Sequence, residues 1–203
     1  MKIRRDIVQG TPEWRAARIG RVTASEVHRL ITPAKLDRSK SRDGYMHELA
    51  AERVLGAPCD ESTDGWRQRG IEMEAEARDW FSLVYEDVEQ VGFIEHDALA
   101  VGCSPDGIVE GKFGLECKCP AAKTHAGYVA RAASLEEDYR LQPQLSLWLT
   151  GWPLWYLVSY CPGMRRVVRE VRPDEACFRA FDLWVPALCA DVDELARMLV
   201  ATP

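Results

Sequence analysis

Two charged residues that can do acid–base or metal chemistry lie in the stretch Gly-Leu-Glu-Cys-Lys-Cys-Pro at residues 114–120. The β-rich composition of this stretch predicts a strand, in which successive side chains point to opposite faces. Glu116 and Lys118 therefore share one face, and Cys117 and Cys119 share the other. This alternation favours a carboxylate and an amine acting together over a pair of thiols.

The cysteines do not predict a zinc site or a disulfide framework. The chain has seven, an odd number without a repeated spacing, whereas a structural zinc site needs pairs of ligands at short spacing. Free thiols indicate a reducing compartment, and we expect the protein to be cytoplasmic. We expect the sulfur of Cys117 to pack as a small apolar group, while its backbone carbonyl remains available to a neighbouring pocket.

Asp106 lies ten residues before Glu116. A hairpin between the β-rich runs 107–109 and 113–119 brings Asp106 to the end of the sheet that carries Glu116 and Lys118. Two close carboxylates repel each other unless a cation lies between them, and hard oxygen ligands select Mg²⁺ or Mn²⁺. Such a metal activates water and polarises a phosphate oxygen, which is the chemistry of phosphodiester hydrolysis. The pattern alone is loose, because an Asp in a turn before an exposed strand also occurs for structural reasons.

Two predicted helices offer further polar side chains to such a site. Glu74 lies in a predicted helix over residues 65–85, and Gln142 lies in one over residues 135–149. A glutamate can add a metal ligand, and a glutamine can orient a water molecule or a phosphate. Lone Glu and Gln residues on helices are usually only solvated, so neither residue identifies the site by itself.

Charge is distributed unevenly along the chain. The net charge is −6, yet residues 1–42 hold eleven Lys or Arg against four Asp or Glu, and residues 43–203 carry −13. Polyanion binding depends on local basic surface and not on the total charge. The basic segment fits nucleic-acid contact and fits a solvated basic arm equally well.

Turn residues and apolar periodicity predict the elements that position these side chains. The predicted helices cover residues 11–20, 23–31, 43–55, 65–85, 135–149 and 174–200, the last interrupted near Pro186. The predicted strands cover residues 88–96, 99–103, 107–109, 113–119, 153–160 and 164–171. This order predicts a single domain over residues 1–203, of the α/β (α+β) class, with a mixed central β-sheet flanked by helices. No apolar run approaches the roughly 20 residues that a membrane span needs.

Five blocks of the chain resemble the lambda-exonuclease (YqaJ-type viral recombinase) family, which belongs to the PD-(D/E)xK nuclease superfamily. The blocks are WRAARIGRVTAS at 14–25, GIEME at 70–74, SPDG at 104–107, LECKCP at 115–120 and YRLQPQLSLW at 139–148. They occur in the order of the family, and together they are specific, although no single block is decisive. The resemblance implies a restriction-endonuclease-like core and a phage-like role in recombination.

The resemblance also implies roles at the reaction centre. The metal ligands are Asp106, Glu116, the backbone carbonyl of Cys117 and the helix glutamate Glu74. The catalytic residues are Lys118 and Gln142, which position the attacking water, together with the ligands Asp106 and Glu116. Gln144 is the alternative to Gln142 if the alignment is shifted.

A second group of residues corresponds to those that hold the 5′-terminal phosphate. Arg18 and Ser25 match the family here, and Ser104 is added to them. The family completes this pocket with an arginine shortly after the catalytic strand, where this chain reads Ala-Ala-Lys-Thr at residues 121–124. Lys123 takes that place as a point charge, without the planar fork of an arginine.

The implied activity is a Mg²⁺-dependent 5′-to-3′ exonuclease, with Mn²⁺ as an alternative and two ions per active site. It acts on double-stranded DNA ends and leaves a 3′ overhang for recombination by strand annealing. The resemblance further implies a homotrimer around DNA and a single-strand annealing protein as partner.

Three alternatives remain open. A site- or structure-specific endonuclease of the same fold cuts closed circular DNA, which an exonuclease leaves intact. A non-catalytic DNA-end-binding module binds duplex ends and releases no nucleotides. An iron–sulfur nuclease needs a cysteine quartet, and Cys59, Cys161, Cys177 and Cys189 have no fitting spacing.

Overall fold

The structure is a computed structural model that describes residues 1–59 and 65–201, without the side chains of residues 65–72. In this part of the chain the strands form two four-stranded sheets. The strands are β1 (Lys2–Arg4), β2 (Val22–Thr23), β3 (Phe93–Glu95), β4 (Val101–Cys103), β5 (Gly107–Val109), β6 (Phe113–Lys118), β7 (Trp155–Ser159) and β8 (Val167–Val171). The helices are α1 (Pro12–Arg18), the 3₁₀ helix η1 (Ala24–Arg29), α2 (Arg42–Leu55), α3 (Gly65–Val84), α4 (Ala122–Ala130), α5 (Ala133–Tyr139), α6 (Leu141–Thr150) and α7 (Glu175–Val200).

Both sheets are mixed. The first has the order β1-β3-β4-β2, with β2 parallel to β4, and the second has the order β5-β6-β7-β8, with β6 parallel to β7. The chain passes from the first sheet to the second between β4 and β5, through residues 104–106. The predicted fold class, a mixed sheet flanked by helices, is confirmed, and the structure adds that the strands divide into two sheets.

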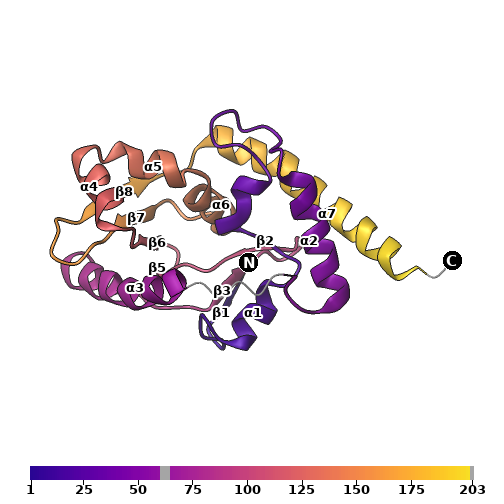
Figure 1. Ribbon diagram of the computed structural model, residues 1–203, viewed down its shortest axis with the longest axis horizontal. Coiled ribbons are helices and arrows are strands. Elements are labelled where there is room, and N and C mark those ends of the chain that lie inside the picture. Colours follow the sequence, from indigo (N-terminus) through magenta and orange to yellow (C-terminus); the bar gives the residue numbers. More distant parts are fainter. Residues whose placement is uncertain (60–64, 202–203) are drawn as a thin grey trace.

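Helices cover both faces of the second sheet, with α3 on one side and α4 and α5 on the other (Figure 1). Leu115 and Cys117 of β6 pack with Met73 and Phe81 of α3. On the opposite side, Leu135 of α5 packs against residues of β7 and β8. The alternation of β6 thus directs its apolar side chains toward α3, as the period of a strand requires.

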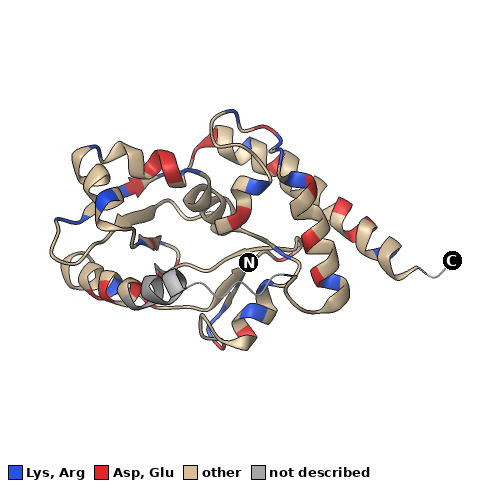
Figure 2. Cartoon of the chain, viewed as in Figure 1, with Lys and Arg blue, Asp and Glu red and all other residues tan. Residues whose placement is uncertain are grey.

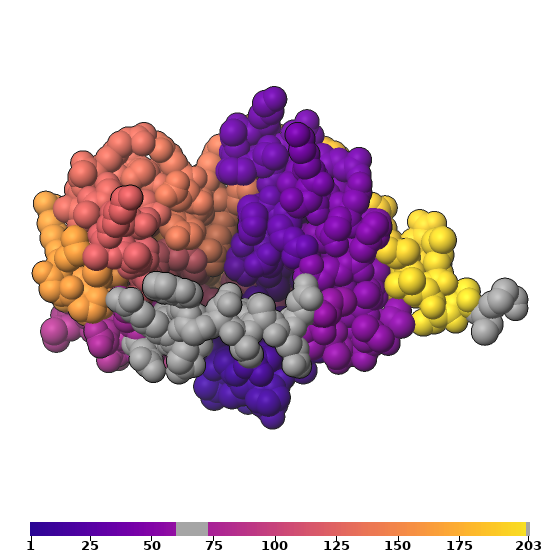
Figure 3. Space-filling view, viewed as in Figure 1, coloured from indigo at the N-terminus to yellow at the C-terminus, as the bar shows by residue number. Residues whose placement is uncertain are grey.

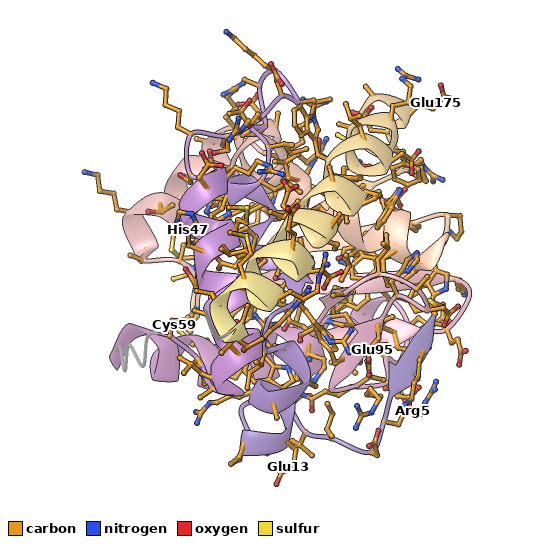
Figure 4. All side chains as sticks on the ribbon, turned by 90° about the vertical axis from the view of Figure 1, so that its right-hand side faces the viewer. Arg5, Glu13, His47, Cys59, Glu95 and Glu175 are labelled. Atoms are coloured by element: carbon orange, nitrogen blue, oxygen red, sulfur yellow. The ribbon has the colours of Figure 1, made fainter. Side chains whose placement is uncertain are left out.

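Helix α7 packs along α2 and α6 and extends to the C-terminus (Figure 1). Figure 4 looks onto this side of the molecule, with Glu175 labelled at the start of α7 and His47 on α2. The predicted interruption near Pro186 is wrong, because α7 is continuous through that residue. Burial of the adjacent Val185 and of Leu188 on the core side of α7 offsets the hydrogen bond that proline cannot donate.

Helix α4 was not predicted, and the helix predicted over 135–149 is divided into α5 and α6. Only His125 and Tyr128 of α4 are buried, so residues 122–130 show no apolar periodicity. A polar contact anchors this helix: the His125 ring lies 2.7 Å from Ser159 Oγ through Nδ1 and 2.9 Å from the Arg165 carbonyl through Nε2. The segment predicted as an α-helix over 23–31 is largely the 3₁₀ helix η1.

No helix within the described part of the chain is both long enough and apolar enough to cross a membrane.

Candidate active site

The predicted hairpin that brings Asp106 to the strand carrying Glu116 and Lys118 is present. Gly107 of β5 pairs with Leu115 of β6, and the backbone N–H of Asp106 donates to the Leu115 carbonyl at 2.9 Å. The Asp106 carboxylate then accepts a hydrogen bond from the backbone N–H of Cys117, with Oδ2 at 2.5 Å from the nitrogen. Asp106 is therefore fixed beside the strand that carries Glu116.

Lys118 lies among three groups from β6, α5 and α6. Its Nζ is 2.7 Å from Glu116 Oε1 and donates to Gln142 Oε1 at 2.8 Å. The same ammonium group lies over the Tyr139 ring, 4.7 Å from its centroid, in a cation–π contact. Lys118 and Glu116 thus face α5 and α6, on the side of β6 opposite its apolar residues.

Glu74 of α3 belongs to the same electrostatic group. Burial raises the pKa of Asp106 well above its usual value, and repulsion from Glu116 and Glu74 raises it further. Burial likewise raises the pKa of Glu74, and Glu116 adds to this increase. Lys118 and Arg78 act in the opposite direction on Glu74. Asp106 and Glu74 therefore lie close enough to the Glu116 carboxylate for its charge to make their ionisation less favourable.

This donor set fits a hard divalent cation. Carboxylate oxygens are the preferred ligands of Mg²⁺, and a cation among them removes both the repulsion and the cost of burying unpaired charge. Among the described residues, no three His, Cys, Asp or Glu side chains form a metal-binding group by themselves. The expected acidic ligands Asp106, Glu116 and Glu74 are all described, and they do not meet as such a group by themselves in this structure.

The neighbouring carboxylates also change the pKa of Lys118. Burial alone lowers the pKa of a lysine, but the charge of Glu116 and its hydrogen bond outweigh this effect and raise the pKa of Lys118 above its usual value. The ammonium group is therefore the stable form in this structure.

A second polar cluster surrounds Ser104, at the junction between the two sheets. Ser104 Oγ accepts a hydrogen bond from Trp14 Nε1 at 2.8 Å and another from Arg18 Nη1 at 3.2 Å. The Arg18 guanidinium also lies over the Trp14 ring, 4.5 Å from its centroid. Two of the predicted phosphate-binding residues, Arg18 and Ser104, are thus in direct contact.

Strand pairing places Ser25 at the same edge of the first sheet as Ser104. Strands β2 and β4 are parallel, with Thr23 paired to Gly102. Ser25 and Ser104 each follow two residues after that pair, so both emerge from the same edge of the sheet. The Ser25 hydroxyl lies 3.3 Å from Thr23 Oγ1.

No hydrogen bond or ion pair among the described residues joins Lys123 to this cluster. Lys123 is exposed in the first turn of α4, and in the described part of the chain it makes no hydrogen bond or ion pair. The fallback residue Gln144 also lies outside the site, because its side chain bonds the backbone before α7 at Arg172 and Asp174.

The structure adds three residues that the sequence did not single out. Trp14 contacts Ser104 and Arg18, and Tyr139 lies under Lys118. Arg78, one helical turn after Glu74, donates to the Asp106 carbonyl at 3.3 Å. Trp14 and Tyr139 lie within the quoted motif blocks, whereas Arg78 carried no signal beyond its spacing from Glu74.

The surface is hollowed between the half of the molecule that contains α4 and α5 and the half that contains η1 and α2 (Figure 3). Arg140, between Tyr139 and α6, links the two halves through a hydrogen bond from Nη1 to the Pro33 carbonyl at 2.8 Å.

Comparisons with known proteins agree on one family. A family model described as a YqaJ-like viral recombinase domain matches residues 13–153. The crystal structure of LHK-Exo in complex with dAMP is similar to this chain, with a TM-score of 0.82 and 31% sequence identity over 93% of this chain and 96% of that one. A crystal structure of the alkaline exonuclease LHK-Exo from Laribacter hongkongensis has a TM-score of 0.81, with 31% identity and the same coverage.

A more distant structure shares the fold. The phage-related exonuclease from Haemophilus somnus 129PT has a TM-score of 0.70 at 15% identity, covering 88% of this chain and 96% of that one. At that identity the similarity supports the fold alone. A comparison with curated proteins gives no match.

Proposed function

Because this chain belongs to the YqaJ-like viral recombinase family, we propose that it is a Mg²⁺-dependent exonuclease that degrades one strand of double-stranded DNA from the 5′ end. The observation that carries the proposal is the contact of Lys118 with Glu116 and Gln142, beside the fixed carboxylate of Asp106. The likeness to an alkaline exonuclease with 31% identity supports the same reaction class. The remaining 3′ strand serves recombination by annealing.

The acidic group provides the metal site. Asp106, Glu116 and the Cys117 carbonyl hold the metal, with Glu74 contributing from α3, and the site takes two ions. When bound, Mg²⁺ or Mn²⁺ polarises a phosphate oxygen and makes water a stronger nucleophile at neutral pH. The raised pKa values of Asp106 and Glu74 support this assignment, since both have burial and like charge as their causes.

The residues around Lys118 position the reactants. The Lys118 ammonium supplies N–H donors that orient the attacking water and stabilise negative charge on the reacting phosphate. Gln142 holds Lys118 at 2.8 Å and turns its amide toward the same water. Glu116 links the two functions, because its carboxylate both faces the metal site and bonds Lys118.

Arg18, Ser104 and Ser25 hold the 5′-terminal phosphate, and Lys123 adds a positive charge near the strand end. An arginine donor suits phosphate because its N–H groups match the oxygen geometry. A homotrimer encloses the duplex, and a single-strand annealing protein receives the 3′ strand. These last two assignments rest on the family resemblance.

A time course on linear duplexes labelled at either 5′ or 3′ ends tests the proposal. With Mg²⁺, label at the 5′ ends is released first, chelation by EDTA stops the release, and closed circular DNA stays intact. Cutting of the circle favours a site- or structure-specific endonuclease instead. Tight binding of duplex ends without release of nucleotides, at any Mg²⁺ or Mn²⁺ concentration, favours the non-catalytic end-binding module.

A lysine pair on one hairpin provides the matched variants for this test. Lys118→Ala lowers kcat by about 100-fold or more, the contribution of a positioned proton-transfer or charge-stabilising group, and leaves duplex binding in place. The control is Lys112→Ala. Lys112 directly precedes β6, is exposed and is paired with Glu86, and its removal leaves cleavage unchanged. Wild-type cleavage by the Lys118 variant contradicts the assignment.

A further inference from the structure

The hydroxyl of Ser104 has both of its acceptor positions occupied by donors from α1. Trp14 Nε1 and Arg18 Nη1 both donate to Ser104 Oγ, at 2.8 and 3.2 Å. A serine hydroxyl has two lone pairs and one proton, whereas an indole N–H and a guanidinium can only donate. The only hydrogen-bonding capacity that Ser104 retains is its own proton, and in the described part of the chain that proton meets no protein acceptor.

The contact between Trp14 and Ser104 is held in place from both sides. Thr11 Oγ1 accepts a hydrogen bond from the Trp14 backbone N–H at the start of α1, which fixes the first helical turn. Arg18 follows four residues after Trp14, so both side chains emerge on one side of the helix. On the other side, Gln9 Nε2 donates to the Pro105 carbonyl at 2.7 Å, immediately after Ser104.

We propose that Trp14 is a positioning residue that makes Ser104 an obligate hydrogen-bond donor, so that this pocket selects a 5′-terminal phosphate over a 5′-hydroxyl. The inference rests on the proposed function, in which Ser104 and Arg18 hold the 5′ end. The oxygens of an ionised phosphate only accept hydrogen bonds, and they therefore match the Ser104 hydroxyl, whose remaining hydrogen-bonding capacity in the described part of the chain is to donate. A 5′-hydroxyl can accept the one bond from Ser104, but its own proton finds no acceptor there and it lacks the further acceptor oxygens of a phosphate.

The test compares kcat/KM on two linear duplexes of one sequence, with and without a 5′ phosphate. Trp14→Phe keeps a ring under Arg18 and removes the N–H, so the Ser104 hydroxyl is free to rotate and to accept. The preference for the phosphorylated duplex falls by about three- to tenfold, the effect of one hydrogen bond. In the Ser104→Ala background, Trp14→Phe has no further effect on that preference.

The matched control is Trp148→Phe, which removes a similar bond, from Trp148 Nε1 to Asp182 Oδ1 at 2.8 Å, far along the chain in α6. It leaves the preference unchanged. Replacing Trp14 by 3-benzothienylalanine, which keeps the indole shape without its N–H, reproduces the Trp14→Phe result and separates it from any loss of packing.

Two results overturn the inference. One is an unchanged preference in both Trp14 variants, and the other is an equal loss on both duplexes, which a purely structural role predicts. Failure of the proposed function is distinct, because wild-type protein then releases nucleotides from neither duplex. In that case fluorescence anisotropy of the same two duplexes with the same variants tests the inference by binding alone, and equal affinities for phosphorylated and unphosphorylated ends overturn it.

Discussion

The two glutamines of α6 lie two residues apart and have different surroundings. Gln142 Oε1 accepts a hydrogen bond from Lys118 at the candidate site. Gln144 is buried and bridges the chain before α7, donating to the Arg172 carbonyl at 2.7 Å and accepting from the Asp174 backbone N–H at 2.9 Å. Residues two apart on a helix point in nearly opposite directions, so one glutamine serves the site and the other serves the fold.

This difference predicts separable effects of the same substitution. Gln142→Ala lowers kcat by about 10- to 100-fold, because Lys118 and its water lose their orientation, and changes the free energy of unfolding little. Gln144→Ala lowers the free energy of unfolding by about 1–3 kcal/mol, because it removes a buried side chain that bonds two partly buried backbone groups. Urea unfolding and single-turnover cleavage on both variants check this, and the reverse assignment of the two effects contradicts the proposed role of Gln142.

At the scale of elements, the start of α7 joins three segments of the chain. Asp174 Oδ1 caps α7 by accepting from the backbone N–H groups of Ala176 and Cys177, at 2.9 and 3.4 Å. Its Oδ2 accepts from Arg140 Nη2 at 2.8 Å, and Arg140 also bonds the Pro33 carbonyl. Asp174, the N-cap of α7, is thus connected through Arg140 to the segment just before α6. Helix α6 carries Gln142.

Asp174 therefore has a capping role and an ion-pair role, which two substitutions separate. Asp174→Ala lowers the free energy of unfolding by about 1 kcal/mol through loss of the cap, whereas Asp174→Asn keeps the cap and loses only the ion pair. The hydrogen bond from Arg140 lowers the pKa of Asp174 below its usual 3.8, with the helix N–H groups adding to the decrease.

Because the pKa of Asp174 is lowered in the folded protein, its ion pair with Arg140 stabilises the fold at neutral pH and not in acid. A lowered pKa in the folded state means that the ion-pair contribution is complete above pH 3.8 and is lost as the pH falls through the folded-state pKa. The stability difference between wild type and Asp174→Asn is therefore present at neutral pH and disappears in acid. Urea titrations over this range measure it, and a difference that grows in acid contradicts the ion-pair role. Because both partners are about one-third exposed, we expect the ion pair itself to contribute little.

Considered as a whole, the molecule is acidic but carries both signs of charge across its helices (Figure 2). The excess of basic residues is confined to residues 1–42, the part of the chain that contains α1 and its Arg18. Charges farther apart than about 10 Å are largely screened at physiological salt. Six arginines of this segment are paired with carboxylates, namely Arg4, Arg5, Arg21, Arg29, Arg38 and Arg42. We therefore expect the attraction of phosphate to depend on the basic residues of α1 beside the Ser104 cluster, in spite of the net charge of −6.

We expect the proposed binding of duplex ends to depend on salt through local charge. We expect affinity to fall about tenfold or more between low and physiological salt, because each neutralised phosphate releases a counterion. Arg15→Glu, at an exposed residue next to Trp14 on α1, weakens binding and reduces the salt slope. Arg179→Glu, at an exposed residue of α7 near Glu175, makes the same charge change and has little effect. Fluorescence anisotropy over a salt series checks both variants, and equal losses contradict a local basic contact.

Local rules predicted strand β6 and its neighbourhood. Glu116 and Lys118 share a face because a strand has a period of two, and Asp106 lies beside them because a short hairpin returns the chain on itself. The family resemblance then supplied roles for Arg18 and Gln142 that neither residue type nor spacing indicates. These inferences need only short stretches of sequence, and the structure places Asp106, Lys118 and Gln142 in one group.

Contacts between distant segments were decided only by the tertiary structure. Trp14 meets Ser104 across 90 residues of sequence, and Arg78 reaches the Asp106 carbonyl across 28. Helix α4 is held by the buried polar contact of His125 rather than by an apolar stripe, so periodicity did not reveal it. Periodicity and turn chemistry act over a few residues, whereas such pairings depend on how whole elements pack. For this chain, the type of chemistry therefore follows from local sequence, and the environment that orients each group follows from the packing.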